Sequence, residues 1–247
     1  MNEKDTQDAN AIHYEERRYA VPATAEYHRA LTRRLIELIS PARRAGRVLD
    51  CGCGTGFFGL AWDDARARGF GVDLSRNMLR YARGRIARLA QADARALPFR
   101  DDAFDAVLAR DFLHHLPNPA PVVAELWRVL RAGGELVAID PHATPPSQFA
   151  RRIVQREDRF SPDHRAFTRR EYVAALSDGF SIRELIPFGY LAFPAVGLPD
   201  IVDFARFLPS PERTGRALAA IDEALERVPL VNRFSWKLIV KAVKSDA

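Results

Sequence analysis

The sequence has only two cysteines, very little lysine and no long unbroken run of apolar residues. Cys51 and Cys53 are separated by one residue, a spacing that disfavours a mutual disulfide, so a disulfide scaffold is excluded. The most apolar stretch, residues 185–198, is interrupted by Pro187 and Pro194, which argues against a membrane-spanning helix. The opening residues are polar and lack the apolar centre of a secretory signal, so we expect a cytoplasmic protein.

The excess of basic charge comes almost entirely from arginine. Only four of the 37 basic residues are lysines, and the balance against 32 acidic residues gives a net charge of +5. The arginines are spread through the predicted helices instead of forming one block with interleaved aromatic residues. A nucleic-acid-binding surface requires such a cluster. We therefore expect solvated, arginine-rich helix faces and no nucleic-acid partner.

The length and composition are those of a globular protein. Of the 247 residues, 47% are hydrophobic and 28% are charged, which is enough for a core that needs no disulfides. Residues 1–24 are mostly polar and show little apolar periodicity, which predicts a flexible N-terminal arm. The remaining residues, 25–247, are predicted to form a single domain.

Short apolar strands alternate with amphipathic helices along much of the chain. Strands are predicted over residues 47–51, 70–73, a short segment that ends at Asp93, 104–110, 135–140, 181–188 and 234–243. Helices are predicted over residues 25–39, 122–130 and 149–160, and two more after the N-caps Ser75 and Thr168. This alternation predicts an α/β fold in which a parallel sheet carries helices on both faces. In such sheets, ligands bind outside the carboxyl ends of the strands.

A glycine-rich segment, residues 50–56, follows the first predicted strand and opens a helix. Gly52, Gly54 and Gly56 alternate, and glycine lets the backbone turn sharply and approach a ligand closely. Counted from Gly52, the dinucleotide-binding fingerprint requires its third glycine at position 57, where the chain has Phe57. The segment also lacks the Gly-Lys-Ser/Thr of a Walker phosphate loop. The spacing therefore disfavours a nicotinamide dinucleotide and a nucleoside triphosphate.

Two aspartates follow the next two predicted strands. Asp73 stands 17 residues after Gly56, where a carboxylate can accept both hydroxyls of a ribose that lies across the sheet. Two such hydrogen bonds contribute roughly 3 kcal/mol, about a hundredfold in affinity. Asp93 ends a short third strand, where it can accept a hydrogen bond from an adenine amino group. Together, the two residues indicate a site for an adenine nucleoside.

These segments, with others further along the chain, closely resemble the class I S-adenosylmethionine-dependent methyltransferases. The segments that match are Val48–Gly56, Gly71–Ser75, Met78–Leu79, Ala92–Ala94, Leu97–Phe99, Phe104–Val107, Leu113–Leu116 and Leu130–Gly134. The resemblance covers about residues 30–140 and is greatest to small-molecule methyltransferases of the ubiquinone and menaquinone type. It implies a doubly wound, mostly parallel seven-stranded sheet with an antiparallel last strand, and S-adenosylmethionine as the cofactor.

The resemblance also implies which residues hold each part of the cofactor. The methionine part is assigned to Asp50, Gly52, Cys53, Gly54 and Gly56, and its sulfonium side to the backbone of Arg110. The ribose is assigned to Asp73, and the adenine to Leu74, Met78, Asp93 and the main chain of Ala94. Cys53 replaces an alanine or glycine that is more common in the family, and it is small enough to keep the loop.

Two adjacent histidines are the candidates for acid–base catalysis. Methyl transfer depends mainly on the alignment of donor and acceptor, but a hydroxyl acceptor would be helped by a base. His114 and His115 follow the fourth predicted strand, near the expected position of the transferred methyl group. A structural role is the alternative for both and the expectation for His164, while His142 is a further candidate. No metal site is predicted, because two cysteines one residue apart lack companion ligands.

Residues 186–208 combine four phenylalanines and a tyrosine with prolines and glycines. We expect an insertion at about residues 189–230 to cover an aromatic or lipid-like small-molecule acceptor, with help from Tyr14 and Tyr19. The alternative is that these aromatic residues complete the core or a homodimer contact. The predicted function is methyl transfer to a small molecule. The competing functions are a catalytically silent S-adenosylmethionine-binding module and, less favoured, a nicotinamide oxidoreductase.

Overall fold

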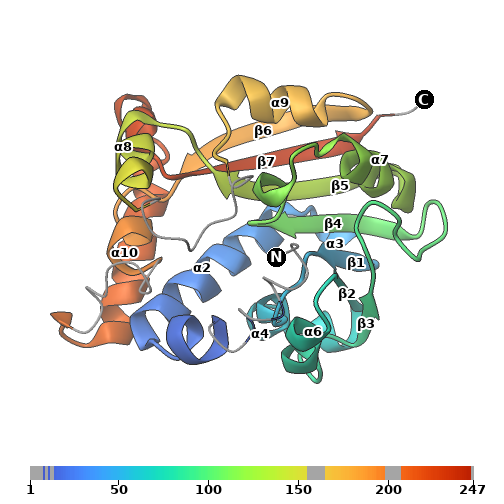
Figure 1. Cartoon of the computed structure of the whole chain (residues 1–247), viewed down its shortest axis with the longest axis horizontal. Coiled ribbons are helices and arrows are strands. Elements are labelled where there is room, and N and C mark those ends of the chain that lie inside the picture. Colours follow the sequence, from blue (N-terminus) through green and yellow to red (C-terminus); the bar gives the residue numbers. More distant parts are fainter. Residues whose placement is uncertain (1–7, 9–10, 12–13, 155–164, 198–206, 246–247) are drawn as a thin grey trace.

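One seven-stranded sheet organises the chain (Figure 1). The computed structural model describes residues 8, 11, 14–154, 165–197 and 207–245. The strands are β1 (Val48–Cys51), β2 (Gly69–Asp73), β3 (Arg88–Gln91), β4 (Phe104–Arg110), β5 (Leu130–Pro141), β6 (Phe180–Phe188) and β7 (Lys237–Lys244). Their order across the sheet is β3-β2-β1-β4-β5-β7-β6.

Only β7 runs against the direction of the other strands. The pairs from β3 through β5 are all parallel, whereas β7 is antiparallel to both β5 and β6. The chain moves outward from β1 to β3 and then crosses back to β4 on the other side of β1, which places the topological switch point between β1 and β4. The prediction of a mostly parallel seven-stranded sheet with an antiparallel last strand is confirmed.

Helices cover both faces of the sheet, as predicted. One face carries α2 (Pro22–Leu38), α4 (Phe57–Ala61), α5 (Ala65–Arg68), α6 (Arg76–Ala82) and α10 (Pro211–Leu225). The other face carries α7 (Ala120–Val129) and α9 (Arg169–Leu176). All four residues of β1 and the first six of β4 are buried, because a parallel strand in such a sheet is covered from both sides.

Local signals explain where several helices begin. The hydroxyl of Ser75 accepts a hydrogen bond from the N–H of Met78 and caps α6, and Thr168 and Glu171 form a reciprocal capping box at α9. Helix α2 begins at Pro22, three residues before the predicted start, because proline is favoured in the first turn of a helix. Upstream of it, Tyr14–Tyr19 (η1) forms a short π-helical turn.

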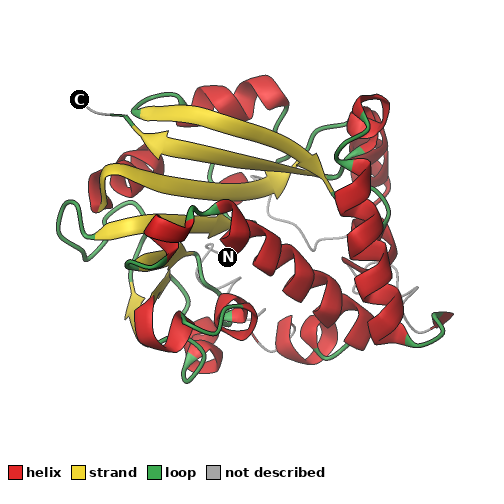
Figure 2. Ribbon diagram, turned by 180° about the vertical axis from the view of Figure 1, so that it is seen from behind, coloured by secondary structure: helices red, strands yellow, loops and turns green. Residues whose placement is uncertain are grey.

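The final third of the chain departs further from the prediction. Helix α8 spans Pro145–Val154, four residues earlier than expected, and the predicted residues 155–160 lie outside the described part. The region predicted as an insertion contains the 15-residue helix α10. The predicted last strand starts three residues late, because Pro229–Phe234 forms a 3-10 helix, η5. In both views, α8 and α10 stand at the end of the sheet where β4 and β5 end (Figures 1 and 2).

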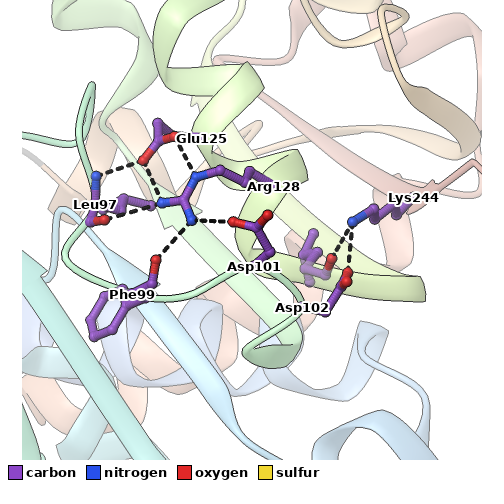
Figure 3. Close-up of polar contacts among 8 residues, drawn as sticks. Leu97, Phe99, Asp101, Asp102, Glu125, Arg128 and Lys244 are labelled. Carbon is purple, nitrogen blue, oxygen red and sulfur yellow. Dashed lines mark hydrogen bonds and ion pairs between the residues drawn. The ribbon is translucent and has the colours of Figure 1, made fainter.

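Arg128 fixes the loop that precedes β4 (Figure 3). Its guanidinium donates to Glu125 at 2.6 Å, to Asp101 at 2.7 Å and to the carbonyls of Leu97 and Phe99 at 2.8–3.1 Å. Glu125 in turn accepts from the N–H of Leu97 at 2.7 Å. These contacts come from helix α7, which packs in the same core cluster as Leu97, so they anchor the loop between β3 and β4 to that helix.

Lys244 makes a similar contact at the end of β7. Its ammonium donates to Asp102 at 2.9 Å and to the carbonyl of Leu130 at 2.5 Å (Figure 3), and it lies 4.0 Å from the ring centroid of Trp127. Asp102 has a left-handed backbone with φ of 53°. The turn before β4 is thus held by residues from both α7 and β7.

Candidate functional site

The glycine-rich loop turns directly after β1. The N–H groups of Gly52 and Cys53 both donate to the carbonyl of Val72, at 2.9 and 3.0 Å, which ties the loop to β2. Gly52, Gly54 and Gly56 have φ values of 73°, 52° and 79°, a left-handed conformation that favours glycine. A Cβ on Gly56 would lie 2.8 Å from the backbone of Ala82, whereas one on Gly54 would meet no atom within 4 Å. The backbone at Gly54 therefore leaves room for a ligand.

The spacing of the loop needs one correction. Counted from Gly54, the sequence also has the dinucleotide spacing, with Gly56 and Gly59 as its second and third glycines. A Cβ on Gly59 would lie 2.1 Å from the carbonyl oxygen of Arg85, so this glycine allows α4 to pack closely on the segment after α6. Glycine spacing alone therefore does not exclude a dinucleotide.

Asp73 connects the loop to the start of α6. One of its carboxylate oxygens accepts from the N–H of Gly54 and the other from the N–H of Ser75, both at 2.8 Å. Burial raises the pKa of Asp73, and these N–H donors oppose that effect. The N–H of Leu74 acts on the same carboxylate, and because a carboxylate has about four lone-pair positions, room remains for a further donor. Asp8 reaches the same place and accepts from the hydroxyl of Ser75 at 2.5 Å and from the N–H of Asn77 at 3.1 Å.

Asp50 is the second buried carboxylate of the loop. It lies in β1, and no described residue donates a hydrogen bond to its carboxylate. Burial raises its pKa to about 7, while the positive charge of Arg110 acts in the opposite direction. A buried carboxylate without a protein donor is costly unless a ligand pairs with it. We call Asp50, residues 52–56 and Asp73 the glycine-loop site.

Arg110, at the end of β4, uses its side chain to hold the N-terminal elements. Its guanidinium donates to Thr32 at 2.8 Å and to the hydroxyl of Tyr19 at 3.0 Å, and it lies 5.4 Å from the ring centroid of Phe57. Tyr19 stacks on Phe57 at 4.2 Å between centroids. Burial acts to lower the pKa of Arg110, but Tyr19, Asp111 and Asp50 together raise it. Sequence reasoning considered only the backbone of Arg110 and missed these contacts.

The residues assigned to adenine lie beside Asp73. Met78 is buried and Leu74 is half-buried, and the N–H of Ala92 donates to the carbonyl of Asp73 at 3.1 Å. Asp93 accepts a hydrogen bond from the side chain of Arg95. This hydrogen bond is the main reason why the pKa of Asp93 is lowered. The next residue, Ala94, is half-buried. The structure thus brings the assigned residues together around the ends of β1, β2 and β3.

His114 belongs to a buried network at the end of β5. Its Nδ1 lies 2.7 Å from Oδ1 of Asp140, which also accepts from the His114 N–H at 3.1 Å. The other oxygen of Asp140 accepts from the hydroxyl of Tyr172 at 2.7 Å. Burial, followed by the neighbouring His115, lowers the pKa of His114 well below its usual value, and burial raises that of Asp140 to about 7. His115 is half-buried, with its ring centroid 4.1 Å from that of His114.

A second ion pair lies beside this network. Lys237, the first residue of β7, pairs with Asp111, and its ammonium lies 4.7 Å from the ring centroid of Phe193. Asp111 has a left-handed φ of 51°, a conformation that costs free energy in a residue other than glycine. Burial acts to raise the pKa of Asp111, but the positive charge of Lys237 outweighs burial and holds this pKa well below its usual range. We call Asp111, His114, Asp140, Tyr172 and Lys237 the β4–β5 cluster.

Tyr27 of α2 borders the β4–β5 cluster. Its hydroxyl is buried and has no hydrogen-bond partner among the described residues. A Cβ on Gly189 would lie 3.7 Å from this hydroxyl and 3.6 Å from the side chain of Lys237. Burial raises the pKa of Tyr27 well above its usual value, so it is a neutral hydroxyl. The sequence offered no signal for Tyr27, because its neighbours Gly189 and Lys237 are distant from it along the chain.

Two other sequence candidates have different outcomes. Nδ1 of His142 lies 2.6 Å from the hydroxyl of Ser235, and burial lowers the pKa of His142 to about 4, which favours a structural role. His164 lies outside the described residues. Among the residues that are described, no group of three or more His, Cys, Asp or Glu is arranged to hold a metal ion. None of the described helices is both long enough and apolar enough to cross a membrane.

Comparison with known proteins finds similarity to methyltransferases over the part of the described sheet from β1 to β5. Residues 49–138 match the family model described as a methyltransferase domain. A phosphatidylethanolamine N-methyltransferase from Cereibacter sphaeroides is 40% identical over 108 residues, which are 40% of this chain and 53% of that protein. A ubiquinone/menaquinone biosynthesis C-methyltransferase from Desulfotalea psychrophila is 39% identical over 110 residues, 42% of this chain and 44% of that protein. Residues 49–138 thus match a methyltransferase domain, and these similarities support a class I S-adenosylmethionine-dependent methyltransferase.

The likeness of fold extends beyond the matched segment. The crystal structure of an S-adenosylmethionine-dependent methyltransferase from Thermotoga maritima superposes with a TM-score of 0.68 and covers 98% of this chain and 99% of that chain. Its sequence identity is 17%, so the likeness establishes the fold alone. In sequence, the chain spans about half the length of the curated relatives it matches.

The glycine-loop site of the methyltransferase domain fits S-adenosylmethionine, the cofactor of this family. The left-handed Gly54 leaves open space beside the loop, Asp50 presents a buried carboxylate without a protein donor, and Asp73 retains room for a further donor. An α-ammonium group and two ribose hydroxyls are the donors that such carboxylates require. The donor set and the open loop are therefore compatible with this cofactor.

Proposed function

We propose that this chain transfers the methyl group of S-adenosylmethionine to a small-molecule acceptor. The observation that supports it most is the glycine-loop site, where a buried carboxylate without a protein donor adjoins an open, left-handed glycine turn. This arrangement suits a ligand that carries a cation and hydroxyl groups. The family assignment supplies the identity of that ligand.

Different residues would bind different parts of the cofactor. Asp50, Gly52, Cys53, Gly54 and Gly56 would hold the methionine part, with the backbone of Arg110 on the sulfonium side, while Asp73 would accept the ribose hydroxyls. Leu74, Met78, Asp93 and the main chain of Ala94 would surround the adenine. When bound, the cofactor supplies an electrophilic methyl group on sulfur. The protein contributes chiefly alignment, which is worth up to roughly 7–11 kcal/mol.

We place the acceptor beside the β4–β5 cluster. This cluster lies at the ends of β4 and β5, next to the topological switch point where ligands of open α/β sheets bind. Lys237 and the hydroxyl of Tyr27 are donors that can orient an oxygen of the acceptor. His114 and His115 remain the candidates for a base, which would contribute about 10²–10⁴ for a hydroxyl acceptor. Of the two, His115 is better suited, because His114 is engaged with Asp140.

We propose an apolar acceptor, since the two relatives named above act by name on a phospholipid and in the synthesis of isoprenoid quinones. Part of the insertion that was predicted to cover the acceptor belongs to the core instead. Phe188, Tyr190 and Phe193 are all buried, and Phe188 and Phe193 belong to the core on the α2 face. Replacing them would first destabilise the fold, as the alternative interpretation holds. Residues 198–206 of the predicted cover lie outside the described part.

A two-stage experiment tests this function. S-adenosylhomocysteine should raise the melting temperature of the protein, because a ligand that binds only the native state stabilises it by RT ln(1 + [L]/Kd), whereas NAD at equal concentration should not. Incubation with methyl-labelled cofactor and an organic extract should then label an extractable product. Stabilisation by NAD alone would refute the assignment, and binding without any labelled product would favour the silent module.

A further inference from the structure

Large apolar side chains are exposed on two neighbouring elements at one end of the molecule. Phe149 on α8 is 66% exposed, and Leu230 and Phe234 on η5 are 75% and 48% exposed. The two elements pack against each other, and both views place α8 beside the chain that enters β7 (Figures 1 and 2). Single exposed apolar residues are ordinary, but a cluster of them marks an interaction site.

The elements that carry these side chains are held rigidly together. Nδ1 of His142 lies 2.6 Å from the hydroxyl of Ser235, and the hydroxyl of Thr144 donates to the carbonyl of Ser235 at 2.8 Å. The hydroxyl of Ser147 donates to the carbonyl of His142 at 2.5 Å. All four residues are buried. The start of α8 and the end of η5 are therefore fixed to each other, and the apolar side chains above them have a defined position.

The same two segments carry only positive charge. Residues 141–154 and 227–237 contain Arg151, Arg152, Arg227, Arg233 and Lys237, and neither segment contains an aspartate or glutamate. Arg152, Arg227 and Arg233 are exposed, whereas Lys237 is buried in its pair with Asp111. On α8, the exposed positions 145, 148, 149 and 152 form one outward stripe. We call Phe149, Arg152, Arg227, Leu230, Arg233 and Phe234 the α8–η5 surface.

The combination of exposed apolar side chains and exposed arginines favours one kind of partner. Exposed phenylalanine and leucine flanked by arginine suit the boundary of a bilayer, where apolar groups enter the acyl region and cations meet phosphate. A second copy of this surface would bring arginines against arginines, a repulsion that a symmetric dimer contact avoids. Single-stranded nucleic acid requires aromatic rings on which bases can stack, and Leu230, the most exposed apolar residue of the three, has no ring.

We propose that the α8–η5 surface binds the face of a bilayer that contains anionic phospholipid. The contact is peripheral and reversible, because three apolar side chains and three arginines are far from the anchoring of a spanning helix. The surface adjoins the β4–β5 cluster, since α8 follows the end of β5 and η5 leads into Lys237. An acceptor that dissolves in lipid would therefore reach the cluster from the bilayer side. This inference stands on the surface itself and does not require methyl transfer.

Sedimentation with extruded vesicles tests the proposal on the full chain. Vesicles of phosphatidylcholine with about 30 mol% phosphatidylglycerol should bind the protein at low salt, and vesicles of phosphatidylcholine alone should bind it at least about tenfold more weakly. The variants R152Q/R227Q/R233Q and F149S/L230S/F234S should each weaken binding by about tenfold or more, because each group of side chains supplies one part of the contact. Their melting temperatures should stay near that of the parent, because the replaced side chains are exposed.

A matched control removes the same charge elsewhere. Arg76, Arg80 and Arg83 are exposed around a cavity of about 370 Å³ beside α6, and R76Q/R80Q/R83Q should leave vesicle binding within about twofold. An equal loss in this control, or equal binding to neutral vesicles, would overturn the proposal in favour of general charge attraction. So would a concentration-dependent dimer that F149S/L230S/F234S abolishes, or tighter binding to a single-stranded oligonucleotide.

Calorimetry with S-adenosylhomocysteine separates this inference from the proposed function. The parent and both surface variants should bind it equally, because the glycine-loop site is not part of the surface. Normal binding of S-adenosylhomocysteine without vesicle binding would refute the surface alone. Vesicle binding without affinity for S-adenosylhomocysteine would refute the cofactor assignment and leave the surface intact.

Discussion

The glycine-loop site and the β4–β5 cluster each bury a carboxylate, but they satisfy it differently. Asp50 and Asp140 both lie in strands of the same sheet, and burial raises the pKa of each to about 7. Asp140 accepts from Tyr172 and from the N–H of His114 and lies within hydrogen-bond distance of the His114 ring. Asp50 has no donor among the described residues. The protein itself completes the polar contacts of Asp140, whereas Asp50 presents its carboxylate to the glycine-loop site.

The two sites also differ in how far apart their parts lie along the chain. Gly54 and Asp73, which meet in the glycine-loop site, are 19 residues apart. In the β4–β5 cluster, Asp111 pairs with Lys237 across 126 residues, and Asp140 bonds Tyr172 across 32. We therefore expect substitutions in the cluster to change stability, and substitutions in the loop site to change cofactor affinity.

The largest effect is expected at Asp140. Asp140→Ala removes the carboxylate that accepts from the buried hydroxyl of Tyr172 and from the N–H of His114 and that contacts the His114 ring, which should cost about 3–5 kcal/mol of unfolding free energy. Tyr172→Phe, the matched partial deletion, should cost only about 1–2 kcal/mol, because it removes one of these donors. Urea unfolding measures both values. Equal and small losses would mean that the cluster is not a structural unit.

Asp73→Ala should produce the reverse pattern. Loss of the carboxylate should weaken S-adenosylhomocysteine binding about a hundredfold, since one or two hydrogen bonds to a charged group disappear. Unfolding free energy should fall less than in Asp140→Ala, because one of the two freed N–H groups belongs to the half-buried Gly54, where water can replace the carboxylate. Calorimetry with unchanged affinity would contradict the assignment of Asp73 to the ribose.

The pH dependence of cofactor affinity isolates Asp50. With a pKa of about 7, Asp50 is mostly protonated at pH 6 and mostly ionised at pH 8, and only the carboxylate attracts an ammonium group. Affinity for S-adenosylhomocysteine should therefore rise up to about tenfold from pH 6 to pH 8, and Asp50→Asn should flatten that rise. A rise that persists unchanged in Asp50→Asn would assign the titration to another group.

Stability should change with pH in the opposite direction. The raised pKa values of Asp50 and Asp140 mean that the folded state holds more protons than the unfolded state between about pH 4 and pH 7. Their contribution is fully present below the unfolded pKa and is lost as the pH rises through about 7. Asp50→Asn should therefore reduce the decline in unfolding free energy between pH 5 and pH 8, relative to the parent.

The smallest effect is expected at Tyr27. Its buried hydroxyl has no partner among the described residues, so Tyr27→Phe should leave unfolding free energy within about 1 kcal/mol of the parent or raise it slightly. The affinity for S-adenosylhomocysteine should not change. If the hydroxyl orients the acceptor, only the acceptor KM should increase. A destabilisation of several kcal/mol would show that the hydroxyl has a structural partner.

Sequence patterns predicted the elements whose causes are local. The bounds of β4 agree at both ends, and the caps at Ser75 and Thr168 are confirmed, because periodicity and capping act within a few residues. Helix α10 was missed, since its place depends on packing against α2 and on Asp222, which accepts from the N–H groups of Leu191 and Ala192. The roles of individual site residues stay predictions that the experiments above address.

The candidate site shows the same division. The loop residues, Asp73 and Asp93 could be found from one segment and its spacing. The partners Tyr172 and Lys237 could not, because no local pattern connects them to Asp140 or Asp111. Asp140 itself carried a usable signal, as an acidic residue near the end of a buried strand.

The position of β7 has a consequence for synthesis. β7 follows β6 in the chain but lies between β5 and β6, so β6 has no neighbouring strand until β7 has left the ribosome. β2, the later of the two strands that hold the glycine-loop site, is complete about 160 residues before β7 begins, and translation at about 5–20 residues per second separates the two events by roughly 8–30 seconds. During that interval, β5 and β6 expose unpaired edges to other chains. The nascent chain is therefore most prone to aggregation after its nucleoside-binding half has formed.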